Sequence, residues 1–251
     1  MKTLLRVFLS CVCVLLVSPT FAWSAEVTMA FGLSLPPYVI SESNSGMEMD
    51  IIREALAFRG HTLKPVYVPL ARVPEEFKTE EIQAVQRDGG TNLTPSGGIY
   101  SNMVSITYHD VIVTLKERGL TVKTPEDLAK LSVVAFQGAI NHYPKWLQPV
   151  KAAGKYYEQK DQLLQVKSLH VGRCDAILGD RNIVQYFTNQ ALKDGSFRVL
   201  PTELHEFTEP YGYNPAFKDP KIRDDFDAGI KHLQETGRYQ EIINSYLQAT
   251  P

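Results

Sequence analysis

The sequence predicts an α/β protein of two lobes, each a mainly parallel sheet flanked by helices, with a two-strand hinge between them. Short apolar runs of strand length alternate with helical patterns, as parallel βαβ units require. The number of these units is large for one sheet. From Tyr211 the pattern changes again, to a short strand followed by two helices. We therefore expect the chain to leave the first lobe and return to it, which creates a cleft between the lobes.

Residues 1–24 are predicted to form a removable secretion signal. A basic tip with Lys2 and Arg6 precedes an apolar run over 7–17, and small residues follow around Ala22-Trp23-Ser24. The apolar run is shorter than the roughly 20 residues that a membrane-spanning helix needs. We therefore expect export, cleavage between residues 22 and 25, and a soluble mature protein outside the cytoplasm.

Composition and charge argue against several classes of protein. Removal of the signal lowers the basic count from 26 to 24 against 28 acidic residues, which gives a net charge of −4. No basic patch for nucleic acid appears. Cys174 is the single cysteine of the mature sequence, which excludes an intramolecular disulfide. No metal-ligand spacing and no nucleophile–base pair appears, and we expect a monomer with no metal, cofactor or catalytic residue.

Lobe one is expected to comprise residues 25–115 and 205–251. Its first strand is short and apolar and ends before the rigid Pro36-Pro37 pair. Its first helix has one apolar side and stops at Gly60, which suits a left-handed cap. The elements predicted for this lobe are strands at 27–33, 63–68, 82–86 and 104–115, a short strand from residue 211, and helices at 49–59, 219–236 and 238–247.

Lobe two is expected to comprise residues 116–204. Thr124 suits the N-cap of its first helix, because Pro125 and two acidic residues follow in the first turn. A strand over 132–136 runs into Gln137-Gly138-Ala139 and a helical stretch. The other elements predicted for this lobe are helices at 161–171 and 181–192 and strands at 174–178 and 197–200.

The two crossings between the lobes are placed near residues 115–119 and 202–207. Two such connections form a hinge, and two hinged lobes enclose a cleft. Ligands of open α/β sheets bind beyond the carboxyl ends of the strands, where helix N-termini converge. We therefore expect a ligand site in the cleft.

Five motifs occur in an order and spacing that resemble one protein family. They are Pro36-Pro37-Tyr38, Gly46-Met47-Glu48-Met49-Asp50-Ile51, Gly90-Thr91-Asn92-Leu93-Thr94-Pro95, Gly172-Arg173-Cys174-Asp175-Ala176 with Asp180, and Gly237-Arg238-Tyr239-Gln240-Glu241-Ile242 with Tyr246-Leu247. Across nearly all of the mature chain they are similar to the bacterial extracellular solute-binding proteins of family 3. The resemblance implies a two-lobe periplasmic-binding-protein fold of type II. It also implies capture of a small polar solute in the periplasm by cleft closure, with the permease of an ABC importer as partner.

Three departures from the family pattern leave the solute open. Amino-acid binders of this family usually place an Arg after the Thr-Pro turn to clamp the ligand α-carboxylate, and here Ser96-Gly97-Gly98 occupies that stretch. A hydroxyl usually follows the glycine of the second lobe, and here Ala139 follows Gly138. The aromatic position of the first-helix motif is Met47. The solute is therefore one without an α-carboxylate, or one that a different Arg holds.

Four residues of lobe one are candidates for the first contact with an amino-acid-like solute or a small carboxylate. Tyr38 follows a rigid Pro-Pro pair, and its ring meets the ligand or caps the lobe core. Asn92 and Thr94 hold an anionic or carbonyl group, or satisfy the backbone of their own turn. Arg72 offers a guanidinium for a carboxylate. Arg87, just after the third strand, competes for that role, and a solvated surface position is the alternative for either Arg.

Three residues of lobe two are candidates for closing over the solute. Gly138 and Ala139 precede a helix, where backbone N–H groups form a seat for an anion. Asp180 follows a strand and begins a helix. The resemblance implies that it meets a ligand ammonium, and a helix cap is the alternative. Glu48 and Asp50 open the first helix and are assigned to its dipole.

Two other functions on the same fold stay open. One is a periplasmic enzyme, such as a dehydratase or a peptidoglycan-cleaving relative, for which the sequence offers no catalytic pair. The other is a ligand-sensing module that acts on a membrane receptor in trans. Fold alone does not separate these functions from transport.

Overall fold

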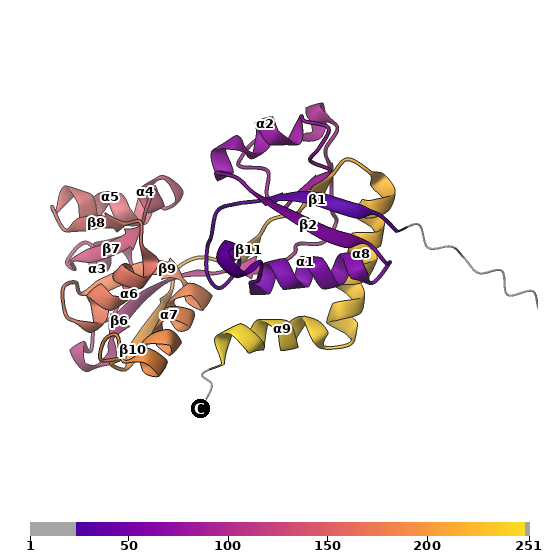
Figure 1. The fold of residues 1–251 in the computed structure, drawn as a ribbon. Helices are drawn as coiled ribbons and strands as arrows, with labels where there is room; N and C mark the ends of the chain where they lie inside the picture. The colour runs from indigo at the N-terminus through magenta and orange to yellow at the C-terminus, as the bar shows by residue number, and fades with distance from the viewer. Residues whose placement is uncertain (1–23, 249–251) are drawn as a thin grey trace, which may run out of the picture.

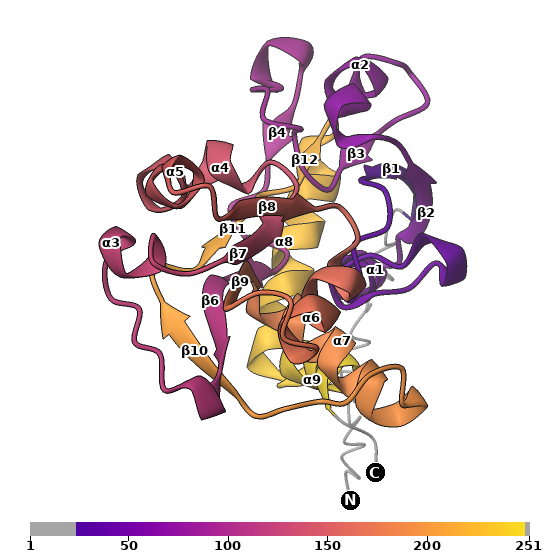
Figure 2. The same ribbon diagram turned by 90° about the vertical axis from the view of Figure 1, so that its left-hand side faces the viewer.

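The computed structural model describes residues 24–248. All of the predicted signal except Ser24 lies outside the described residues. Figure 1 shows two α/β lobes that are joined by narrow connections, and Figure 2 views the molecule with the lobe on the left of Figure 1 in front. In the described range, no helix is both long enough and apolar enough to cross a bilayer.

The sheet of the first lobe contains five strands. In spatial order they are β2 (Thr62–Tyr67), β1 (Glu26–Phe31), β3 (Ala84–Val85), β12 (Ala216–Phe217) and β4 (Ile99–Tyr100). β1 is parallel to β2 and β3, whereas β12 is antiparallel to β3 and β4. The strand from the end of the chain therefore inserts between strands from its beginning, which ties the two halves of this lobe together.

Helices cover this sheet and complete the core of the first lobe. They are α1 (Met47–Ala57), α2 (Val73–Phe77), α8 (Pro220–Glu235) and α9 (Arg238–Leu247), with short 3-10 turns at Ser41–Ser43, Leu70–Arg72 and Thr94–Ser96. The apolar side of α1 is fully buried, as its sequence predicts, and packs against α8 (Figure 1). The helices approach closely at Gly229, where a Cβ atom would lie 2.0 Å from the carbonyl oxygen of Ala55.

The sheet of the second lobe also contains five strands. In spatial order they are β10 (Thr202–Glu206), β6 (Asp110–Leu115), β9 (Ala176–Asp180), β7 (Val133–Phe136) and β8 (Tyr156–Gln159). β7 is parallel to β8 and β9, and β6 is antiparallel to β9 and β10. Successive residues of β6 enter different cores, because Val111 and Val113 face one side of the sheet and Ile112 faces the other.

Helices lie on both faces of the second sheet. They are α3 (Pro125–Leu128), α4 (Ala139–His142), α5 (Pro144–Ala152), α6 (Gln162–His170) and α7 (Arg181–Asp194). α6 and α7 contribute to the core on one face, and α3, α4 and α5 contribute to the core on the other. Both faces are thus covered, as is typical of sheets with parallel strands.

The hinge is a two-stranded antiparallel sheet of β5 (Thr107–Tyr108) and β11 (Tyr211–Gly212). The long strand predicted over 104–115 is therefore two strands that serve different sheets. The chain enters the second sheet at Asp110, so the first crossing, placed near 115–119, is corrected. The chain leaves this sheet after Glu206, within the range 202–207 predicted for the second crossing. The alternating, β-branched pattern over 104–115 favoured a single strand, although the polar pair His109-Asp110 stands at the break.

Other elements differ in smaller ways. The strand expected at 197–200 is irregular chain, although Phe197 packs into the core. The strand expected at 174–178 begins at Ala176 and ends at Asp180. Helix α1 begins at Met47, two residues before its predicted start. The short elements α2, β4 and β12 were not predicted, because they have too few residues to show a hydrophobic repeat in the sequence.

Thr124 caps α3 as predicted, in a reciprocal capping box. Its hydroxyl oxygen accepts from the Asp127 N–H at 3.2 Å, and the Asp127 carboxylate accepts from the Thr124 N–H at 3.3 Å. We expect Thr124→Ala to lower the free energy of unfolding by about 1 kcal/mol in urea titrations. Thr124→Ser keeps the acceptor and should change little. Equal losses for both variants would contradict the capping role.

Candidate functional site

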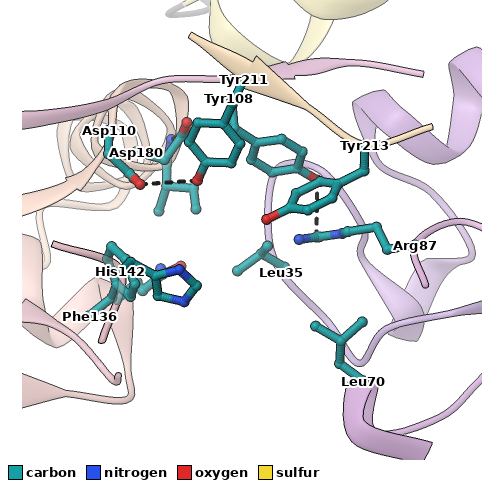
Figure 3. Close-up of a pocket in the computed structure, with 12 residues that line it drawn as sticks. Leu35, Leu70, Arg87, Tyr108, Asp110, Phe136, His142, Asp180, Tyr211 and Tyr213 are labelled. Atoms are coloured by element: carbon teal, nitrogen blue, oxygen red, sulfur yellow. Dashed lines mark hydrogen bonds between the residues drawn. The ribbon is translucent and has the colours of Figure 1, made fainter. Parts of the chain in front are cut away.

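A cavity of about 190 Å³ lies between the lobes beside the hinge (Figure 3). Its volume restricts an occupant to a small molecule, and its wall combines apolar surface with a few charged groups, as in small-molecule sites. The lining residues are Leu35, Leu70, Arg87, Tyr108, Asp110, Phe136, His142, Gln162, Asp180, Ile183, Tyr211 and Tyr213.

Tyrosines of the hinge form one wall of the cavity. Tyr108 and Tyr211 stack with ring centroids 5.8 Å apart, and Tyr213 meets both rings edge-on. Tyr38 stacks on Tyr108 at 4.1 Å. Because β5 and β11 carry two of these rings, a molecule that contacts them also contacts the segment that joins the lobes.

Arg87 is the cation of the cavity wall. Its guanidinium lies 4.8 Å from the ring centroids of both Tyr108 and Tyr213, and its Nη2 donates to the Tyr108 hydroxyl at 3.0 Å. Burial opposes its charge, but the nearby Tyr108 and Glu48 outweigh burial and raise the pKa of Arg87. Nη1 donates to no described residue and is not fully enclosed, so it is free for an anion.

Glu48 supports Arg87 from behind. It is fully buried, and its carboxylate accepts from the side chains of Gln86, Ser105 and Tyr108. The Tyr108 hydroxyl thus donates to Glu48 while it accepts from Arg87. The helix-dipole role assigned to Glu48 from the sequence is incomplete, because this carboxylate also balances the cavity's cation.

Two buried carboxylates, Asp110 and Asp180, lie on the opposite side of the cavity in register on β6 and β9. Burial raises the pKa of Asp180 to about 6, although hydrogen bonds from His109, Ile183 and Tyr38 oppose the shift. Burial also raises the pKa of Asp110. Figure 3 shows these acids near Phe136 and His142 and shows Arg87 beside Tyr213, so the cavity carries opposite charges at its two ends.

The four lobe-one candidates lie away from the lining of the cavity. Tyr38 is fully buried in the lobe core, the alternative that the sequence allowed. The Arg72 side chain is 68% exposed and pairs with Glu76 at 2.6 Å. Asn92 and Thr94 are exposed, and the Asn92 side chain accepts from the Thr94 N–H at 3.0 Å within its own turn. Their ligand contacts stay predictions.

Of the lobe-two candidates, Asp180 reaches the cavity. Gly138 is left-handed at φ 84°, and its N–H donates to Glu158 at 2.9 Å. Ala139, the first residue of α4, is fully buried in the core of the second lobe. Asp180 also caps α7, because its Oδ1 accepts from Asn182 N–H and Ile183 N–H. A ligand role for these residues is a prediction as before.

Several cavity residues escaped the sequence reasoning. No sequence motif marks them, because they converge only in the folded protein. They are Tyr108, Asp110, Tyr211, Tyr213 and Phe136. A usable signal existed for Arg87, because a polar residue just after a parallel strand lies at the edge of the sheet where ligands bind. Among the described residues, no cluster of three or more His, Cys, Asp or Glu side chains suits a metal ion.

Solved structures share this arrangement of two lobes. An ancestral cationic amino acid solute-binding protein matches with a TM-score of 0.68 at 16% identity, over 89% of this chain and 96% of that one. The second substrate-binding domain of Lactococcus lactis GlnP, in an open conformation, matches with a TM-score of 0.63 at 17% identity, over 90% and 96%. The chain has the two-lobe fold of the periplasmic solute-binding proteins. The fold class predicted from the sequence is confirmed.

The same fold also serves another kind of protein. A histidine kinase sensor domain, described as similar to periplasmic binding proteins, matches with a TM-score of 0.61 at 16% identity, over 88% of this chain and 96% of that one. No family model matches the chain. At these identities the comparisons define the fold, and the function must be argued from the cavity.

Proposed function

We propose that this protein captures a small polar solute in the cavity between its lobes and delivers it to an ABC importer. The observation that carries the proposal is Arg87, a half-buried cation with a free Nη1 at the hinge end of the cavity. Its Nε is enclosed without a partner, and a partly desolvated charge with unused hydrogen-bonding capacity is costly for folding alone, so a ligand role is a reason to retain it.

The solute docks first on the lobe-one side. An anionic group, such as a carboxylate, binds Arg87, and the rings of Tyr108 and Tyr213 hold the guanidinium in place. A cation that is already fixed loses little side-chain entropy on binding. Arg87 therefore takes the role that the sequence left open between Arg72 and Arg87.

Lobe two then closes over the solute. Phe136, His142 and Gln162 lie on its side of the cavity and gain contacts as the cleft narrows. Closure is favoured only by contacts that are stronger in the closed form than in the open form. The permease reads the closed shape, in the periplasm, after removal of the signal.

A sensing role is the second candidate, because the histidine kinase sensor domain shares the fold at a TM-score of 0.61. Both roles require binding without turnover, which separates them from an enzyme. Genes for a permease and an ATPase beside this gene favour import, and a neighbouring sensor kinase favours sensing. Release of a new product from the bound compound would favour the enzyme.

A thermal-shift screen against amino acids, small carboxylates, amines and oligosaccharides tests the proposal. A ligand that binds the folded state alone raises the melting temperature. We expect hits among solutes with a carboxylate and no turnover of them. A screen in which no compound shifts the melting temperature would count against solute capture.

We expect Arg87→Gln to weaken binding of these hits about 10- to 150-fold, because hydrogen bonds to charged groups contribute about 1.5–3 kcal/mol. Arg72→Gln is the matched control, since Arg72 is exposed outside the cavity lining, and its affinity should stay within about twofold. Titration calorimetry on both variants decides. A larger loss of affinity for Arg72→Gln than for Arg87→Gln would assign the anion-binding role to Arg72.

A further inference from the structure

Most of the acceptor capacity of Asp180 is already used by the protein. Its Oδ1 accepts from the Asn182 N–H at 2.9 Å, the Ile183 N–H at 3.0 Å and the Tyr38 hydroxyl at 2.9 Å. Its Oδ2 accepts from the His109 N–H at 2.9 Å. A carboxylate offers about two lone-pair sites on each oxygen, so Oδ1 is saturated and Oδ2 keeps one site. A ligand ammonium at Asp180 would have to share Oδ2 with the His109 N–H.

Asp110 lies beside Asp180 in the sheet and has acceptor capacity to spare. Its Oδ2 accepts from the hydroxyls of Tyr143 and Tyr211, the latter at 3.0 Å. Its Oδ1 accepts no hydrogen bond from the described residues. The fully enclosed side-chain atoms without a partner in the described range are all nitrogens. Oδ1 is therefore not sealed from the cavity that Asp110 lines.

The surroundings of Asp110 suit a positively charged group. Phe136, His142 and Tyr211 line the same end of the cavity, and Figure 3 shows them around the acid. Aromatic faces attract cations, and a carboxylate oxygen accepts their hydrogen bonds. The other end holds Arg87, which repels cations and attracts anions.

We propose that Asp110, and not Asp180, receives a cationic group of the solute. This inference rests on the proposed function and deepens it, because it selects solutes with an anionic group toward Arg87 and a cationic group toward lobe two. Asp110 belongs to the sheet of lobe two. Its contact with a solute held by Arg87 therefore links the two lobes and favours closure.

Pairs of compounds that differ only in an amine test the inference. The probes are glutamine with glutaramate and 6-aminohexanoate with hexanoate, measured by titration calorimetry, together with hits of the solute screen and their amine-free analogues. We expect wild type to bind the amine-bearing member of a bound pair at least tenfold more tightly. Asp110→Asn should abolish this preference and leave binding of the amine-free member within about threefold. Asp194→Asn, an exposed acid at the end of α7, is the control and should keep the preference.

Each outcome separates this inference from the proposed function. Equal binding of both members by wild type overturns the role of Asp110 and leaves solute capture intact. A preference that survives Asp110→Asn also overturns it. If no probe or screened compound binds wild type, the proposed function fails and this inference fails with it. The wild-type comparison decides even if Asp110→Asn does not fold, which its melting temperature will reveal.

Discussion

Asp180→Ala should lower the free energy of unfolding by about 3–5 kcal/mol. The substitution removes the N-cap of α7, a loss of about 1 kcal/mol. It also leaves the buried Tyr38 hydroxyl and the His109 N–H without their acceptor, and each unsatisfied group costs about 1–3 kcal/mol. Because Tyr38 comes from lobe one, the same carboxylate connects the two lobes.

Asp161→Ala is the matched control for this substitution. Asp161 is also an N-cap aspartate in lobe two, but it is exposed and accepts only from the Leu164 N–H, at 3.1 Å. We expect it to cost about 1 kcal/mol in the same urea titration. Equal losses for the two variants would show that the bonds of Asp180 to Tyr38 and His109 contribute little.

The stability conferred by Asp180 should also depend on pH. The pKa of its carboxyl is about 6 in the folded protein, and an unfolded Asp has a pKa near 4. Between these values the folded state holds a proton that the unfolded state has lost, so stability falls as pH rises through this window. We expect the difference in unfolding free energy between wild type and Asp180→Ala to be larger at pH 4 than at pH 7. A difference that does not change with pH would contradict the raised pKa.

The sequence predicted the two-lobe architecture because its evidence is local and repeated. Apolar runs and caps mark each βα unit, and the observed elements follow them closely. The hinge escaped because residues 104–115 alternate and are rich in β-branched residues, as in one strand, although His109 and Asp110 stand at the break. Which sheet a strand joins depends on its partners, and a period-2 pattern carries no information about partners.

The candidate site was harder to predict than the fold. Asp180 was found because one position at the end of a strand serves as both helix cap and cavity wall. Arg87 was named, yet its preference over Arg72 depends on Tyr108 and Tyr213, which are distant in sequence and meet it only through the hinge. These contacts arise from tertiary packing, which the residue types alone do not predict.

Glu48→Ala should have an effect of at least the same size, about 3–5 kcal/mol. Glu48 is fully buried, and the variant leaves the donors of Gln86, Ser105 and Tyr108 without their acceptor. It also removes the carboxylate to which Arg87 is linked through the Tyr108 hydroxyl. Each buried donor that is left without an acceptor costs about 1–3 kcal/mol, so three such donors account for a loss of this size.

The control for Glu48 is an acid on the same helix. A double-mutant cycle then measures the coupling between Glu48 and Arg87. Glu54 on α1 pairs with Arg238 near the surface, and Glu54→Ala should cost less than about 1 kcal/mol. In urea titrations, Glu48→Ala with Arg87→Leu should cost less than the sum of the two single variants by at least about 1 kcal/mol. Additive losses would mean that Glu48 and Arg87 are not coupled. In that case Arg87 would keep its charge in the cavity without a supporting anion, and its position would depend on the tyrosine rings alone.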